Sequence, residues 1–280
     1  MNDTDDWYQI RTLSEDSWEI REGTMFGMYL VRGDSRALLI DTGCGVGDLR
    51  RTVSDLVDVP VTVLLSHSHW DHLGGAHAFD DVLIHDLERT GDGRVPPDVV
   101  TDDFGYGPED WIADWHGADR SFPDGFDPDR FRIETATGVD AVEPGTTIDL
   151  GGKRVELVHV PGHSPGQLAV LDRESSVCFG GDVLHADHDL YVHFDGCDLR
   201  DYHDTLERLW ELVEAEAFET LYVSHAEPVS GDDMLILETL RDGIENILAD
   251  DIEYELVDDH PPARRYEIGE TNVLTTPNAV

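Results

Sequence analysis

The densest group of chemically capable side chains follows the apolar, β-branched run at positions 61–65. It contains His67, His69, Asp71 and His72, and neutral imidazole and carboxylate are ligands that suit zinc, iron and manganese. Alternate side chains of an extended segment share a face, so we expect the first three to point one way and His72 the other. Surface histidines in an acidic protein are the other interpretation, but four such side chains at one strand end disfavour it. The cluster therefore predicts a metal site at the end of a buried strand.

Three later segments each end a predicted strand with one more candidate ligand. His163 stands in a Pro-Gly turn, Asp182 follows two glycines, and His225 follows the apolar run 221–223. Paired glycines allow a close approach of the backbone to another group. A single His or Asp after a strand is usually only a turn residue. Four such strand ends in one chain predict a site along the edge of a β core.

Together these segments resemble the metallo-β-lactamase superfamily over about residues 25 to 225. The resemblance rests on His-x-His-x-Asp-His at 67–72, His163 in Pro-Gly-His-Ser-Pro-Gly, Asp182 in Gly-Gly-Asp, His225 in Ser-His, and Asp41-Thr42-Gly43 after the strand at 37–40. It implies an α/β (α+β) fold, the four-layer αββα sandwich of that superfamily. With 280 residues, 40% of them apolar, the chain is long enough to form this fold, and we expect a single domain over residues 1–280.

The same resemblance implies two metal ions, most simply zinc, with iron or manganese as alternatives. By position, one ion would take His67, His69 and His163, the other would take Asp71, His72 and His225, and Asp182 would bridge them. Every ligand position of the dinuclear pattern is filled. β-Lactamases of this fold often carry Cys where Asp182 stands, so the aspartate argues against antibiotic hydrolysis as the main role.

Two such ions would make a bridging hydroxide the nucleophile, since a metal lowers the pKa of bound water from 15.7 to about 7. Asp71 is then the expected catalytic residue, which orients the hydroxide and passes a proton to the leaving group. Asp41 is a candidate to accept the free N–H of a ligating histidine. Tyr191 and His185 are candidates for substrate contacts, and the alternative that they line a solvated loop stays open.

The expected activity is metal-dependent hydrolysis of a small ester, thioester or lactone. We expect this small-molecule substrate to be the main binding partner. A phosphodiester also fits two metals. From another class, persulfide dioxygenases of the same fold use one iron held by residues that match His67, His163 and Asp182. Residues from about 87 to 130 are rich in Gly, Pro and Asp with interspersed aromatics, which predicts an irregular segment that is either a lid over the site or poorly ordered. The aromatics favour the lid.

The charge balance is extreme, with 19 basic against 61 acidic residues and a net charge of −42. The acids are spread along the whole chain, which predicts an acidic folded surface of the kind that resembles adaptation to extreme salt. No basic face is available for nucleic acid.

No apolar run approaches the roughly 18 residues of a membrane span. The N-terminus lacks a signal peptide and the three cysteines form no CxxC pair, so we expect a cytoplasmic protein, and a homodimer is one option for its assembly.

Hydrophobic periodicity places the secondary structure around these motifs. Strands are expected at 25–31, 37–40, 61–65, 82–85, 154–160, 168–171, 177–179 and 221–223, and helices at 48–56, 74–79, 199–218 and 234–248.

Overall fold

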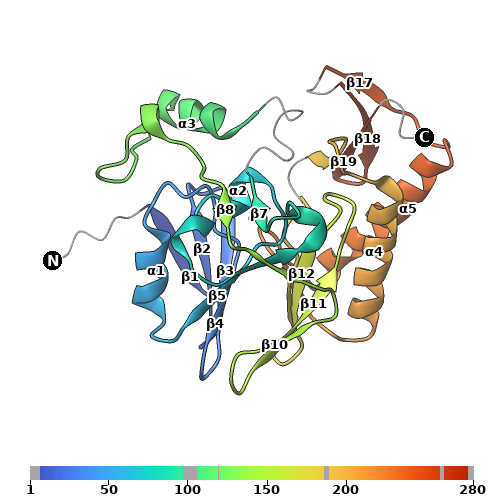
Figure 1. Cartoon of the computed structure of the whole chain (residues 1–280). Helices are drawn as coiled ribbons and strands as arrows, with labels where there is room; N and C mark the ends of the chain where they lie inside the picture. Colours follow the sequence, from blue (N-terminus) through green and yellow to red (C-terminus); the bar gives the residue numbers. More distant parts are fainter. Residues whose placement is uncertain (1–6, 97–105, 119, 186–188, 259–261, 277–280) are drawn as a thin grey trace. The chain divides into compact units, whose positions relative to one another are not determined.

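The computed structural model of the chain describes residues 7–96, 106–118, 120–185, 189–258 and 262–276 (Figure 1). It divides into two compact units, each with its own hydrophobic core. Among the described residues, unit 1 comprises 7–96, 106–118, 120–142 and 149–154, and unit 2 comprises 143–148, 155–185, 189–258 and 262–276. Among the described residues, no helix has the length and apolar character needed to cross a membrane. The single domain expected over residues 1–280 stays a prediction.

Unit 1 is built on a seven-stranded mixed sheet with the order β1-β2-β3-β4-β5-β6-β9. Its strands are β1 Tyr8–Thr12, β2 Ser17–Glu22, β3 Phe26–Arg32, β4 Ala37–Ile40, β5 Val61–Leu64, β6 Val82–His85 and β9 Asp140–Val142. The first four strands pair antiparallel, and β4, β5, β6 and β9 pair parallel. Because β4, β5 and β6 run parallel, the segments that follow them leave the sheet at the same edge. The metal motif follows β5 at that edge.

Short helical elements follow the strands of unit 1. Helix α1, Leu49–Leu56, begins at Asp48, whose side chain accepts a hydrogen bond from the Arg51 N–H, as expected of an N-cap. Buried Leu49 and Val53 attach this helix to the core. The remaining elements are helix α2 Trp70–Leu73, the 3₁₀ turns η1 Ala76–Ala78, η2 Asp86–Glu88 and η4 Pro128–Arg130, and the small β7–β8 pair, Arg94–Val95 with Ala136–Thr137.

The segment at 87–130 is more ordered than the sequence suggests, because it contains helix α3, Pro108–Gly117. Pro108 opens this helix, and the Asp110 side chain accepts from the Gly107 N–H, so local capping stabilises a helix that hydrophobic periodicity does not reveal. The expectation of an irregular segment is therefore wrong at α3. Positions 97–105 and 119 lie outside the described residues, and a role as a lid stays a prediction.

Aromatic packing joins this segment to the core of unit 1. The buried Trp111 ring lies 5.1 Å from Phe26 and 6.2 Å from Trp7, both in edge-to-face geometry. Trp115 and Phe122 add further contacts to Trp7, at 5.1 and 6.0 Å. The aromatics that the sequence places in a lid thus serve, at least in part, as core residues.

Unit 2 carries two sheets and two long helices (Figure 1). The six-stranded sheet has the order β10 Thr147–Asp149, β11 Arg154–His159, β12 Leu168–Asp172, β13 Val177–Phe179, β15 Thr220–Tyr222 and β16 Val229–Ser230. Helices α4, Leu199–Glu214, and α5, Leu235–Leu248, contribute Leu206, Leu209, Leu240 and Ile244 to its core, which confirms the helical faces expected from periodicity.

A four-stranded sheet, which the sequence analysis did not anticipate, completes unit 2. Its order is β14 Asp189–Val192, β19 Thr271–Thr275, β18 Ala263–Ile268 and β17 Glu255–Val257. The last three strands form an antiparallel C-terminal meander, and β19 pairs parallel with β14. Strand β14, which follows Asp182 closely in the sequence, is therefore hydrogen-bonded to the C-terminal strand β19.

Candidate metal centre

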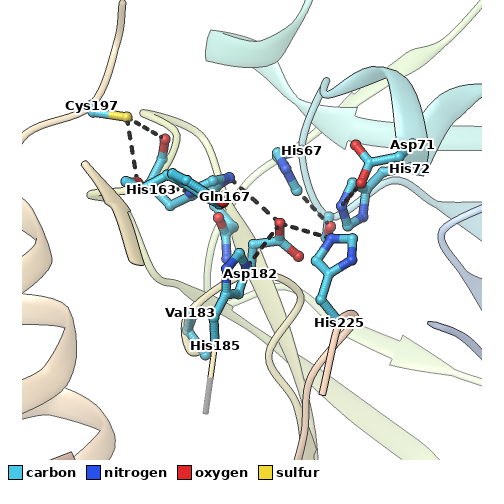
Figure 2. Close-up of polar contacts among 12 residues, drawn as sticks. His67, Asp71, His72, His163, Gln167, Asp182, Val183, His185, Cys197 and His225 are labelled. Atoms are coloured by element: carbon cyan, nitrogen blue, oxygen red, sulfur yellow. Dashed lines mark hydrogen bonds and ion pairs between the residues drawn. The ribbon is translucent and has the colours of Figure 1, made fainter. Parts of the chain in front are cut away.

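The four side chains of the 67–72 motif gather in unit 1. The ring centroid of His67 lies 4.4 Å from that of His69 and 4.1 Å from that of His72. His72 Nε2 lies 3.7 Å from Asp71 Oδ2 (Figure 2). The backbone of His69 is extended, and helix α2 begins at the next residue, Trp70. Successive residues of a helix are rotated by about 100° rather than 180°. The expected alternation of faces is therefore wrong for Asp71 and His72, which lie in a helical turn.

Asp41 anchors this motif through three contacts. Its Oδ1 accepts from the Ser66 N–H at 2.7 Å, and its Oδ2 accepts from Ser66 Oγ at 2.8 Å and lies 2.8 Å from His72 Nδ1. The residue is buried and has a φ of +63°, a left-handed conformation that non-glycine residues adopt only where their surroundings impose it. A carboxylate beside Nδ1 keeps the proton there, so Nε2 of His72 carries the lone pair that a metal needs.

Glu88 is a second buried carboxylate at the motif, and the sequence analysis missed it. Its Oε2 accepts from the Ser68 N–H at 3.1 Å and from Ser68 Oγ at 2.6 Å, and the residue is 2% exposed. Ser66 and Ser68, on either side of His67, are thus each anchored by one carboxylate. No pattern in the sequence marks Glu88, since it stands 20 positions from Ser68.

In unit 2, three imidazoles converge on one oxygen of Asp182 (Figure 2). The Nε2 atoms of His225, His185 and His163 lie 3.2, 3.5 and 3.6 Å from Asp182 Oδ2. Asp182, His163 and His185 are buried, and the His225 side chain is 15% exposed. Three imidazole nitrogens around a buried carboxylate form a donor set that fits a divalent cation.

The backbone around Asp182 is held by hydrogen bonds from buried residues. Gln167 Nε2 donates to the Gly180 carbonyl at 3.1 Å, and the Ser224 N–H donates to the Gly181 carbonyl at 3.1 Å. The Tyr202 hydroxyl of helix α4 donates to the Val183 carbonyl. Burial, and to a smaller extent the charge of Asp182, raises the pKa of Tyr202 well above its usual range, so this phenol stays a neutral donor.

His163 is fixed at both its ring and its backbone. Its Nδ1 lies 3.1 Å from the Tyr191 carbonyl, and Cys197 Sγ donates to the His163 carbonyl at 3.0 Å. The Tyr191 ring lies 5.8 Å from the ring of His185, edge to face. Each unit therefore presents a buried cluster of His and Asp side chains, and the imidazole tautomers that can be assigned leave Nε2 as the ligand atom.

The sequence-predicted residues thus fall into two sets. Unit 1 brings together His67, His69, Asp71 and His72 with Asp41, and unit 2 brings together His163, Asp182 and His225 with His185. Both sets fit a metal site, whose number and kind of ions stay predictions.

Comparison with known proteins supports this interpretation of the chain. The family model described as "Metallo-beta-lactamase superfamily" matches residues 28–225. Human acyl-coenzyme A thioesterase MBLAC2 is 28% identical over 238 residues, which cover 79% of this chain and 81% of the human protein. Hydroxyacylglutathione hydrolase GloC of Haemophilus influenzae is 27% identical over 168 residues, 54% of this chain and 62% of its own length.

Solved structures agree on the fold. The metallo-β-lactamase family protein TTHA1429 of Thermus thermophilus has a TM-score of 0.60 at 22% identity, over 85% of this chain and 82% of that one. A metallo-β-lactamase of Pontibacter korlensis has a TM-score of 0.56 at 18% identity, over 85% and 99% of the two chains. The expected mixed α/β fold with two main sheets is confirmed. With its family match spanning both His and Asp clusters, the chain belongs to the metallo-β-lactamase superfamily.

Proposed function

We propose that the His and Asp clusters of this chain bind two divalent metal ions, most simply zinc, and that the chain hydrolyses thioesters. The convergence of three imidazole nitrogens on Asp182 Oδ2, at 3.2–3.6 Å, is the observation that carries the proposal. A divalent cation bound by these side chains would offset the cost of burying the carboxylate. The filled ligand pattern of the family supports a second ion held by Asp71, His72 and His225.

Bound metal ions would supply a water of lowered pKa as nucleophile and would polarise the carbonyl of the substrate. The protein's own residues supply position and proton transfer. Asp41 and Glu88 hold the 67–72 loop through Ser66 and Ser68, which keeps the ligand side chains from rotating away. The carboxylate of Asp71 is 13% exposed, which supports its assignment as the residue that passes a proton to the leaving thiolate.

The substrate class follows from the chemistry that two relatives share by name. MBLAC2 is an acyl-coenzyme A thioesterase and GloC is a hydroxyacylglutathione hydrolase, and both of their substrates are thioesters. The match to MBLAC2 covers a larger share of this chain and of the relative than the match to GloC does. An acyl-coenzyme A thioester is therefore the first substrate to test, and a small ester or a lactone belongs to the wider class.

The test measures thiol release by the full chain, purified and assayed in molar KCl with added Zn²⁺. Acyl-coenzyme A and a hydroxyacylglutathione are compared by this readout, and hydrolysis of a lactone and of a phosphodiester is followed separately by proton release. We expect the chain to hydrolyse a thioester. Chelation should abolish this activity and added Zn²⁺ should restore it, and His69→Ala should lower the rate to a few per cent of wild type or less. Absence of any thioester turnover, with oxygen uptake in the presence of a persulfide and iron, would contradict the proposal in favour of the mononuclear oxygenase.

A further inference from the structure

His185 is the one imidazole of the Asp182 cluster that the family ligand pattern does not include. It is 5% exposed, and its Nε2 lies 3.5 Å from Asp182 Oδ2. Asp182, His185 and His225 each offer one ligand atom, and these atoms lie within 4.8 Å of one another. A set of three side chains, all in unit 2, thus has the dimensions of a metal site.

The tautomer of His185 indicates what its Nε2 faces. Its Nδ1 lies 3.3 Å from the Asp189 carbonyl, an atom that only accepts hydrogen bonds, so Nδ1 carries the proton. Nε2 is then the ring nitrogen that faces the carboxylate, 3.5 Å from Asp182 Oδ2. A zinc ion bonds imidazole nitrogen and carboxylate oxygen at about 2.0–2.2 Å, so one ion can bind both atoms at this separation.

The neighbouring ligand His163 is held in the same way. Its Nδ1 contacts the Tyr191 carbonyl at 3.1 Å, so alternate carbonyls of strand β14 fix both imidazoles. Metal-binding histidines generally donate the second ring N–H to a carbonyl or carboxylate. We propose that His185 Nε2 is an additional metal ligand, which shares an ion with Asp182 and His225.

The C-terminal strands position this ligand. Strand β19 pairs parallel with β14, and Thr271 Oγ1 donates to the His185 carbonyl at 3.3 Å. Asn272 Nδ2 and Arg265 Nη2 donate to Asp189 Oδ1 at 2.7 and 3.1 Å. These residues lie beyond the family match, which ends at 225, so the brace is a feature of this chain outside the family core.

The test reads metal binding without substrate, because the assignment rests on the proposed metal centre but not on thioester hydrolysis. The full chain in molar KCl is stripped with a chelator and titrated with Zn²⁺ against a chromophoric competitor, and in parallel with Co²⁺ to record visible spectra. His185→Gln is compared with His116→Gln, an exposed histidine of α3. We expect His185→Gln to lower the affinity for one equivalent of Zn²⁺ by at least about tenfold and to change the visible spectrum of the Co²⁺-loaded protein. Asn272→Ala should act in the same direction and less strongly.

Unchanged affinity and an unchanged Co²⁺ spectrum in folded His185→Gln would overturn the assignment, even if hydrolysis is lost, because His185 would then act on the substrate. Weakened metal binding in a protein that hydrolyses no thioester would refute the proposed function and leave the assignment standing. Should His185→Gln fail to fold, anomalous diffraction from the Zn²⁺-loaded wild-type chain decides. A metal–Nε2 distance of about 2.0–2.1 Å supports the ligand, and a metal beyond bonding reach of Nε2 overturns it.

Discussion

Asp41 and Glu88 anchor the loop around His67 from two sides, and both do so through the N–H and the hydroxyl of a serine. Hydrogen bonds to a buried carboxylate are charge-assisted and stronger than neutral ones. A loop held in this way keeps its imidazoles in place before any metal binds. Preorganisation of this kind lowers the cost of ordering ligands on binding.

Glu88→Gln tests this role, because the amide keeps the size of the side chain and removes its charge. We expect Zn²⁺ affinity to fall by about 10- to 100-fold, the usual effect of losing a group that orients a ligand. Chelator competition measures the loss, with Glu109→Gln as control, since Glu109 is 73% exposed and forms an ion pair with a similarly exposed arginine at the surface. Affinity within twofold of wild type in folded Glu88→Gln would contradict the role of Glu88.

At the scale of elements, the strands that precede the candidate ligands could be predicted from the sequence. The groups that brace these segments could not. Strands 37–40 and 82–85 match β4 and β6 because continuous apolar runs are typical of buried parallel strands. Glu88 reaches Ser68 because β6 pairs parallel with β5, and that pairing is a tertiary contact without a local signal. The arginine-rich β18 was missed for the same reason, since its partner strands stabilise it.

The candidate ligands could be identified from the sequence because they cluster in short segments with fixed spacing. Their conformation could not, since the change from extended backbone to helix at Trp70 depends on what packs behind the motif. Gly74, at the end of α2, shows how close that packing is. An added Cβ at Gly74 would lie 2.1 Å from the Cys44 carbonyl oxygen.

Gly74→Ala should therefore displace α2 from the loop after β4. Gly74 has ordinary right-handed helical angles, so steric overlap is the only penalty, and we expect a loss of about 1–3 kcal/mol in the free energy of unfolding. Gly117→Ala is the matched control, because a Cβ there, in helix α3, meets nothing within 4 Å. Denaturant unfolding compares the two, and equal stability of both variants would contradict the tight approach.

At the scale of the molecule, the net charge of −42 dominates. With 61 acidic residues against 19 basic ones, most carboxylates lack a cationic side chain to pair with, and their mutual repulsion opposes folding at low salt. The screening length falls from about 10 Å at 0.1 M salt to about 3 Å at 1 M. Molar salt therefore removes most of this repulsion between surface carboxylates.

We predict that the melting temperature rises steadily between 0.1 M and molar KCl. Calorimetry or circular dichroism measures it, with sucrose at equal osmolality as the control for solute exclusion, because a sugar does not screen charge. A melting temperature that is independent of KCl, or that sucrose raises equally, would refute a stabilisation by charge screening.

The most direct test of the dinuclear centre is the metal content of the full chain, purified in molar KCl without chelators and measured by elemental mass spectrometry. We predict two equivalents of zinc or manganese per chain, with a marked loss of metal in Asp182→Ala because that residue would bridge both ions of the proposed centre. A single equivalent of iron would contradict the dinuclear hydrolase and indicate the oxygenase chemistry of the same fold.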